Sequence, residues 1–204
     1  MECGGCRVTP ETSHNRQAYS LKNKLKIRNI GFLWDLGEPL PKFGSKNKVA
    51  IRAAMPKDRG RLRKIVLEAY LPDWSWWVRK TGGKERARAD LMSYVNEFLG
   101  DRERRIFVAE EGGKIIGFSG AAKYDRGTGT IGYGVAVLPG FRKRGIGSML
   151  LLAALDWLKK SGVRFVTLEE ETFGFANKDS PAIILYKSLG GKIISDQIFS
   201  QAQV

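Results

Sequence analysis

Residues 146–160 place the strongest constraint on how this chain can fold. The segment is apolar on almost every side between Met149 and Leu155. A helix of that kind has to be covered over most of its surface. It therefore predicts a layered domain that encloses it, because one exposed sheet or one neighbouring helix would leave apolar surface in water.

Helical and strand-like periodicities alternate on both sides of this segment. The predicted order is a strand at 49–51, helices at 58–70 and 84–99, strands at 105–109, 115–118 and 130–138, the helix at 146–160, a strand at 163–168, a helix from the N-cap Ser180 to Gly190, and a strand at 192–198. A three-strand antiparallel meander that leads into βα units predicts an α/β fold with a mixed sheet. We expect residues 48–204 to form this domain, preceded by a basic N-terminal extension at 1–47.

The chain carries 35 Lys and Arg residues against 21 Asp and Glu residues, a formal charge of +14. Such an excess favours an anionic partner: a nucleic acid, an acidic surface or a phosphorylated ligand. No run approaches the roughly 18 apolar residues of a membrane span, and the first residues lack a secretory h-region. We therefore expect a cytoplasmic protein with no membrane partner.

Three glycine motifs could bind phosphates. Gly127–Gly132 has G-x-G-x-x-G spacing, but a strand follows it where a dinucleotide fold needs a helix, so a hairpin turn fits better. Gly140–Gly145 has P-loop spacing but is followed by Ile146 in place of Lys, which excludes ATP or GTP hydrolysis. Arg142–Gly147 joins a strand to the buried helix. The N-terminus of that helix and the three basic side chains of the loop together favour the binding of a pyrophosphate. A solvated basic loop is the alternative.

The segment Val135–Ser148 resembles the acetyl-CoA motif of the GNAT N-acetyltransferase superfamily, Q/R-x-x-G-x-G/A. The pattern Ala182-x-x-Leu185-Tyr186-x-x-x-Gly190 and the order of elements extend the resemblance over about residues 48–199. It implies acetyl-CoA as cosubstrate, no metal, and a primary amine as acceptor.

The resemblance also implies where the cosubstrate binds. The strand before the loop splays from its neighbour, and backbone groups there meet the pantetheine arm and the thioester oxygen. The implied residues on that strand are Val135, Ala136 and Val137. Those implied around the pyrophosphate are Arg142, Lys143, Arg144, Gly145, Ile146, Gly147 and Ser148.

Tyr186 falls where the family places its general acid. A tyrosine of pKa near ~10 is protonated at neutral pH and can donate to a departing thiolate, whose pKa is near ~8.5. A core tyrosine on an amphipathic helix is the alternative. Leu168-Glu169 resembles the protein N-terminal (ribosomal-protein alanine) acetyltransferase branch, in which a Glu at that strand end acts as base through water. A solvated acidic strand end is the alternative for Glu169, and the link at 172–178 is longer than in that branch.

Trp74, Trp76 and Trp77 lie between the first two helices, a connection that forms one wall of the family's acceptor site. An aromatic plug in the core or an interface is the alternative. The family also adds a strand after the last one predicted here. Its place could stay empty, be filled by Leu25–Trp34 of the extension, or be filled by a partner chain; an uncovered edge favours a homodimer.

Cys3 and Cys6 form a C-x-x-C with His14 downstream, too few ligands for zinc and outside the βαβ setting of a redox dithiol. The sequence thus predicts an acetyl-CoA-dependent N-acetyltransferase that acts on a protein N-terminal α-amine or a small-molecule amine. A basic module that binds nucleic acid or docks on the ribosome, and a non-catalytic CoA sensor, are the competing hypotheses.

Overall fold

The computed structural model describes residues 24–43, 48–70, 82–173 and 179–202. In chain order the elements are β1 (Lys24–Asp35), β2 (Ala50–Ala53), α2 (Arg59–Tyr70), α4 (Lys84–Gly100), β3 (Arg104–Glu111), β4 (Lys114–Lys123), β5 (Thr128–Thr130), β6 (Val135–Val137), α5 (Ile146–Lys160), β7 (Phe165–Phe173), α6 (Pro181–Ser188) and β8 (Lys192–Ala202). This order confirms the predicted α/β class. Among these residues, no helix is both long and apolar enough to cross a bilayer.

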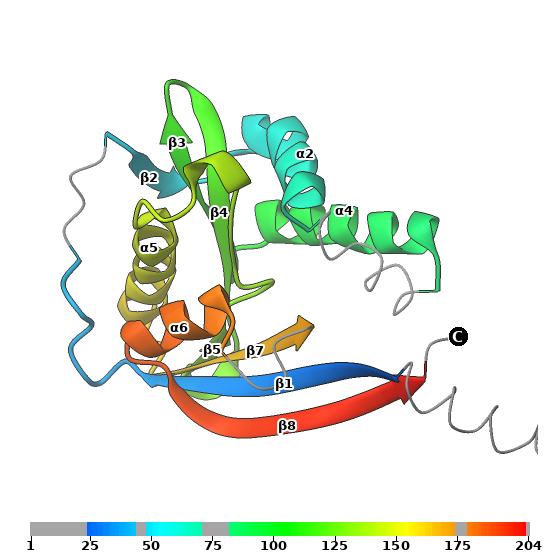
Figure 1. The fold of residues 1–204 in the computed structure, drawn as a ribbon. Coiled ribbons are helices and arrows are strands. Elements are labelled where there is room, and N and C mark those ends of the chain that lie inside the picture. The colour runs from blue at the N-terminus through cyan, green and yellow to red at the C-terminus, as the bar shows by residue number, and fades with distance from the viewer. Residues whose placement is uncertain (1–23, 44–47, 71–81, 174–178, 203–204) are drawn as a thin grey trace, which may run out of the picture.

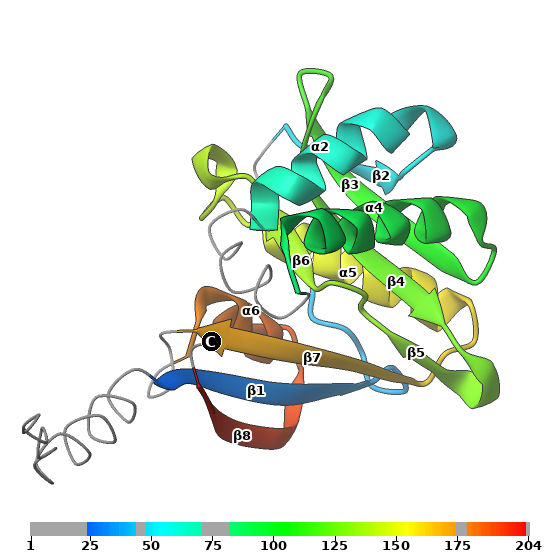
Figure 2. The same cartoon turned by 90° about the vertical axis from the view of Figure 1, so that its right-hand side faces the viewer.

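The strands form one twisted mixed sheet in the order β2-β3-β4-β5-β7-β1-β8, with β6 paired to β4 (Figures 1 and 2). Among the strands that the structure describes, only β5 and β7 form a parallel pair. Helix α5 packs on one face of β4, and α2 and α4 cover the other face (Figure 1). The apolar helix is enclosed as its sequence predicts: Leu150, Leu151, Ala154, Leu155 and Leu158 are fully buried.

The sheet splits where the sequence predicted one strand over 130–138. That prediction was wrong: the strand ends at Thr130 and β6 begins only at Val135. Tyr133 and Gly134 have φ values of 54° and 64°, and this left-handed backbone interrupts the strand. Strand β5 pairs with β7, whereas β6 pairs with β4. The N–H of Ile131 still donates to Thr167 on β7, so the two halves of the sheet separate beyond Ile131, which is the splay that the family resemblance implies.

Strand β1 lies between β7 and β8 and is antiparallel to both (Figure 2). It contains the segment Leu25–Trp34, so the extension fills the place that the sequence analysis left open. Ile30, Phe32 and Trp34 are buried in one cluster with side chains of α5, β7 and α6. The hydrophobic core thus includes residues from both sides of position 47.

Candidate active site

The turn before β6 is held by hydroxyl groups from three elements. Tyr94 on α4 donates to the carbonyl of residue 132 at 3.2 Å, Tyr70 on α2 donates to that of residue 133, and Ser119 on β4 donates to that of residue 134 at 3.1 Å. Left-handed backbone at two consecutive positions persists only where its surroundings fix it. These three hydroxyls supply that restraint, and they set where β6 begins.

Two residues of β6 direct their backbone N–H and C=O groups into the split of the sheet. The N–H of Leu138 donates to the carbonyl of Ile116 on β4. Because backbone groups alternate in direction along a strand, those of Val135 and Val137 point away from β4. The side chain of Arg142 accordingly reaches the outward carbonyl of Val137, with its Nε 2.9 Å away.

Tyr186 lies beside this split, buried to 1% exposure. Its hydroxyl donates to Glu170 Oε2 at 3.4 Å. A Cβ placed on Gly134 would lie 2.7 Å from the same hydroxyl, so only glycine leaves the oxygen this space. The helix that carries Tyr186 begins as the sequence predicts, with the Ser180 hydroxyl accepting from the N–H of Ile183.

The surroundings of Tyr186 hold its proton in place. Burial is the main cause that raises its pKa well above the usual value, and the charge of Glu170 acts in the same direction. The backbone N–H of Val135 hydrogen-bonds the oxygen and opposes the shift. The hydroxyl therefore stays protonated throughout the neutral range and can act as a proton donor.

The two neighbouring glutamates on β7 lie on opposite faces of the sheet. Glu170 is opposite Ile30 and shares the face of Tyr186, whereas Glu169 is opposite Gly31 and is exposed on the other face. The structure therefore brings Glu170, which the sequence did not single out, to the tyrosine. Alternation from the buried Leu168 would have revealed this, because Glu170 lies on the same face as Leu168.

The loop before α5 forms a second part of the candidate site, in addition to the surroundings of Tyr186. Gly145 is the N-cap of α5, with a left-handed φ of 75°. Ile146 is buried and anchors the loop in the core, while a Cβ on Gly147 would lie 3.2 Å from Leu185 on α6. The first turn of α5, which includes Ser148, leaves backbone N–H groups free of intrahelical partners and able to bind an anion.

The three basic side chains of the loop differ in their contacts. Arg142 binds the carbonyl of Val137, as described above. Arg144 forms an ion pair with Glu111 at 2.6 Å, which raises the pKa of the guanidinium, and its side chain lies over Phe141. Lys143 is exposed and has a left-handed φ of 60°. The backbone of the loop is thus better placed than its arginines to hold a pyrophosphate.

Several predicted residues lie outside the part of the chain that the structure describes. They are Trp74, Trp76, Trp77, Cys3, Cys6 and His14. Conversely, no sequence motif indicates Tyr70, Tyr94 or Ser119 as site residues. Each lies within an ordinary helix or strand pattern, and its contact with residues 132–134 depends on tertiary packing.

Comparisons with known proteins agree with this geometry. A mycothiol acetyltransferase from Renibacterium salmoninarum is 25% identical over 168 residues, which are 80% of this chain and 46% of that protein. A GCN5-related N-acetyltransferase from Sphaerobacter thermophilus has a TM-score of 0.65 and 22% identity, over 94% of this chain and 57% of that one. AAC(6')-Iy, in complex with the bisubstrate analogue CoA-S-monomethyl-acetylneamine, has a TM-score of 0.52 and 20% identity, over 78% of this chain and 100% of that one.

The chain spans about half the length of the curated relative that it matches. That relative is a mycothiol acetyltransferase, not a ribosomal-protein acetyltransferase, so the comparison does not support the branch that Leu168-Glu169 resembles. The model of the acetyltransferase (GNAT) family matches residues 64–190, more than half of the chain and all of the candidate site between β6 and α6. This chain therefore belongs to the GNAT acetyltransferase family.

Proposed function

We propose that this chain transfers an acetyl group from acetyl-CoA directly to a primary amine. The observation that carries the proposal is the hydroxyl of Tyr186, hydrogen-bonded to Glu170 beside the start of β6. Family membership supplies the class of reaction. The split between β6 and β7 supports the binding of an extended arm there, and the α5 N-terminus supports the binding of its phosphates.

In the proposed reaction, the amine nitrogen attacks the thioester carbonyl and forms the new C–N bond. The negative charge that develops on the carbonyl oxygen is stabilised by a backbone N–H, for which Val137 is best placed because its backbone groups point away from β4. The C–S bond then breaks, and Tyr186 protonates the departing thiolate. The proton lost by the amine passes to a carboxylate through water, and solvent restores the tyrosine proton.

We assign the base to Glu169. It is exposed on the face of β7 opposite Tyr186, so an amine that approaches the split from that face would meet the base, while the tyrosine meets the departing sulfur from the other face. Glu170 then keeps the tyrosine hydroxyl oriented. The acceptor remains the sequence-based proposal, a protein N-terminal α-amine or a small-molecule amine, and the name of the curated relative favours a small molecule.

The proposal is tested by incubating the protein with acetyl-CoA and a panel of acceptors. The panel contains peptides with different N-terminal residues, spermidine and an amino sugar. We expect release of free CoA, matched by a gain of one acetyl mass on at least one acceptor. CoA binding without any acetyl transfer would instead favour the sensor hypothesis, and affinity for RNA without affinity for CoA would favour a nucleic-acid-binding module.

Neighbouring substitutions separate the roles of the two glutamates. We expect Glu169→Gln to lower kcat/KM at pH 7 by about tenfold or more, because the base is lost, and to lower it less at pH 9, where more amine is already deprotonated. Glu170→Gln is the comparison on the opposite face: its amide oxygen can still accept from the Tyr186 hydroxyl, so we expect a smaller loss of kcat/KM, without the recovery at pH 9. Steady-state rates across this pH range measure both variants. A larger loss in Glu170→Gln than in Glu169→Gln would contradict the assignment.

A further inference from the structure

We propose that Trp34, on the N-terminal strand β1, is a positioning residue that fixes Tyr186 at the candidate active site. The inference rests on the proposed function, because Tyr186 matters only if the chain transfers acetyl groups. It assigns a role in that reaction to a segment far from the acetyl-CoA motif.

Helix α6 has only eight residues, Pro181–Ser188. Helices of this length are not stable alone in water, so their position depends on tertiary contacts. Tyr186 lies on its last turn, and the hydroxyl must meet Glu170 and the start of β6 at hydrogen-bonding distance. A small displacement of the helix would therefore separate the hydroxyl from both groups.

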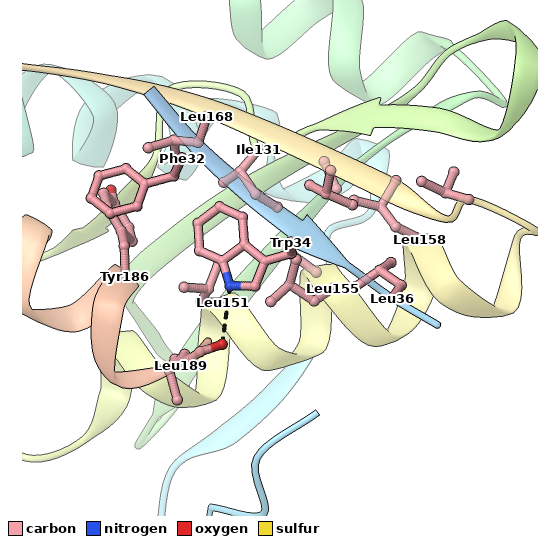
Figure 3. Close-up of a cluster of buried hydrophobic side chains, with 14 of the residues drawn as sticks. Phe32, Trp34, Leu36, Ile131, Leu151, Leu155, Leu158, Leu168, Tyr186 and Leu189 are labelled. Carbon is pink, nitrogen blue, oxygen red and sulfur yellow. Dashed lines mark hydrogen bonds between the residues drawn. The ribbon is translucent and has the colours of Figure 1, made fainter. Parts of the chain in front are cut away.

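Trp34 holds the C-terminal end of this helix (Figure 3). Its indole Nε1–H donates to the carbonyl of Leu189, at the C-cap of α6, across 3.0 Å and inside the core. The Trp34 ring also meets the Tyr186 ring edge to face, with the centroids 6.1 Å apart. Phe32, two residues earlier on the same face of β1, makes a closer edge contact at 5.3 Å.

The residues that follow α6 pack closely against this indole. A Cβ on Gly191 would lie 2.7 Å from Trp34 Cζ2 and 2.8 Å from the carbonyl oxygen of Tyr186. Only glycine lets the chain turn so closely beneath the ring. The N–H of Gly191 donates to that same carbonyl at 3.0 Å. Trp34, Gly191 and the end of α6 thus form one tightly packed unit.

Strand β1 also holds the other end of the helix. Arg28 contacts Asp179, just before the N-cap of α6, at 3.1 Å, and Asp196 on β8 at 2.7 Å. The pKa of Asp179 is lowered mainly by its hydrogen bond with Lys187 and further by Arg28, and the pKa of Asp196 is lowered mainly by Arg28, so both carboxyl groups stay charged. Helix α6 is therefore fixed to the same strand at its beginning by an ion pair and at its end by the indole.

The test is Trp34→Phe, which keeps an aromatic ring but removes the N–H donor. We expect kcat to fall by about tenfold or more, because small misplacement of a reacting group is costly. KM for acetyl-CoA should stay within about twofold, because the α5 N-terminus is untouched. In NMR spectra of protein labelled with ¹³Cζ-tyrosine, the pKa of Tyr186 should move down towards its ordinary value as the hydroxyl leaves its buried place.

Trp157→Phe is the matched control. Trp157 lies near the C-terminal end of α5, against Phe107 and Arg105 on β3, and its substitution should leave kcat and the Tyr186 titration unchanged. If Trp34→Phe does not fold, Arg28→Gln tests the other end of α6 with the same two measurements. Unchanged kcat and titration in the folded variant would overturn the inference. Absence of acetyl transfer by the wild-type protein would overturn the proposed function, whatever the NMR titration shows.

Discussion

Tyr186→Phe is expected to lower kcat by about a hundredfold, the scale at which positioned proton donors contribute. The variant loses the only hydrogen that the side chain can give to the departing thiolate, while the ring stays packed against Phe32. The substitution also removes the hydrogen bond between this hydroxyl and Glu170. Release of free thiol under saturating substrates measures the effect.

The same variant should bind CoA normally, because the phosphates are expected at the α5 N-terminus and not at this hydroxyl. Calorimetric titration with CoA tests that expectation. Tyr124→Phe serves as the matched control, since Tyr124 is 52% exposed and lies beyond the end of β4. Equal turnover in Tyr186→Phe and Tyr124→Phe would remove Tyr186 from the mechanism and leave it as a core tyrosine.

Gly134→Ala should have the second large effect. The residue has a φ of 64°, and left-handed backbone costs a non-glycine residue about 1–2 kcal/mol. The new Cβ would also lie 2.7 Å from the Tyr186 hydroxyl, which is buried and has no room to retreat. Either the hydroxyl or the start of β6 must move, so we expect kcat to fall about tenfold or more.

Gly140→Ala is the control for this substitution. Gly140 lies on the other side of β6, in the turn Pro139–Phe141; it has no positive φ, and a Cβ there would meet no atom within 4 Å. We expect Gly140→Ala to keep wild-type kcat and midpoint of thermal unfolding, and Gly134→Ala to lower both. Wild-type kcat in Gly134→Ala would show that the contact between Gly134 and Tyr186 is not needed in the reaction.

Local patterns were sufficient to predict most of the elements. The apolar stripe of residues 146–160 reproduces α5 to the residue, and Ser180-Pro181 marks the start of α6. Local patterns were not sufficient to predict the break in the strand at residues 131–134. Thr130 to Leu138 has the composition of one strand, and the left-handed turn is stabilised by Tyr70, Tyr94 and Ser119 from distant parts of the chain.

The residues of the candidate site could likewise be predicted only in part from the sequence. Tyr186 and the α5 loop carry short motifs, so sequence resemblance located them, and the structure places both beside the split. Glu170 has no motif of its own, and its contact with Tyr186 depends on which face of β7 meets α6. The role of Trp34 depends on a contact between residues 155 positions apart, which no local pattern encodes.

The place of β1 in the sheet has a consequence for biosynthesis. Its contacts span 155 residues to Leu189 and 168 residues to Asp196, so the first strand of the core leaves the ribosome long before its partners. At about 5–20 residues per second, the delay is about ten to thirty seconds. Ile30, Phe32 and Trp34 gain their cover in steps, from α5 and β7 first and from α6 and β8 at the end of that time. The nascent chain therefore carries an exposed apolar segment, of the kind that chaperones bind, until β7, α6 and β8 have been synthesised.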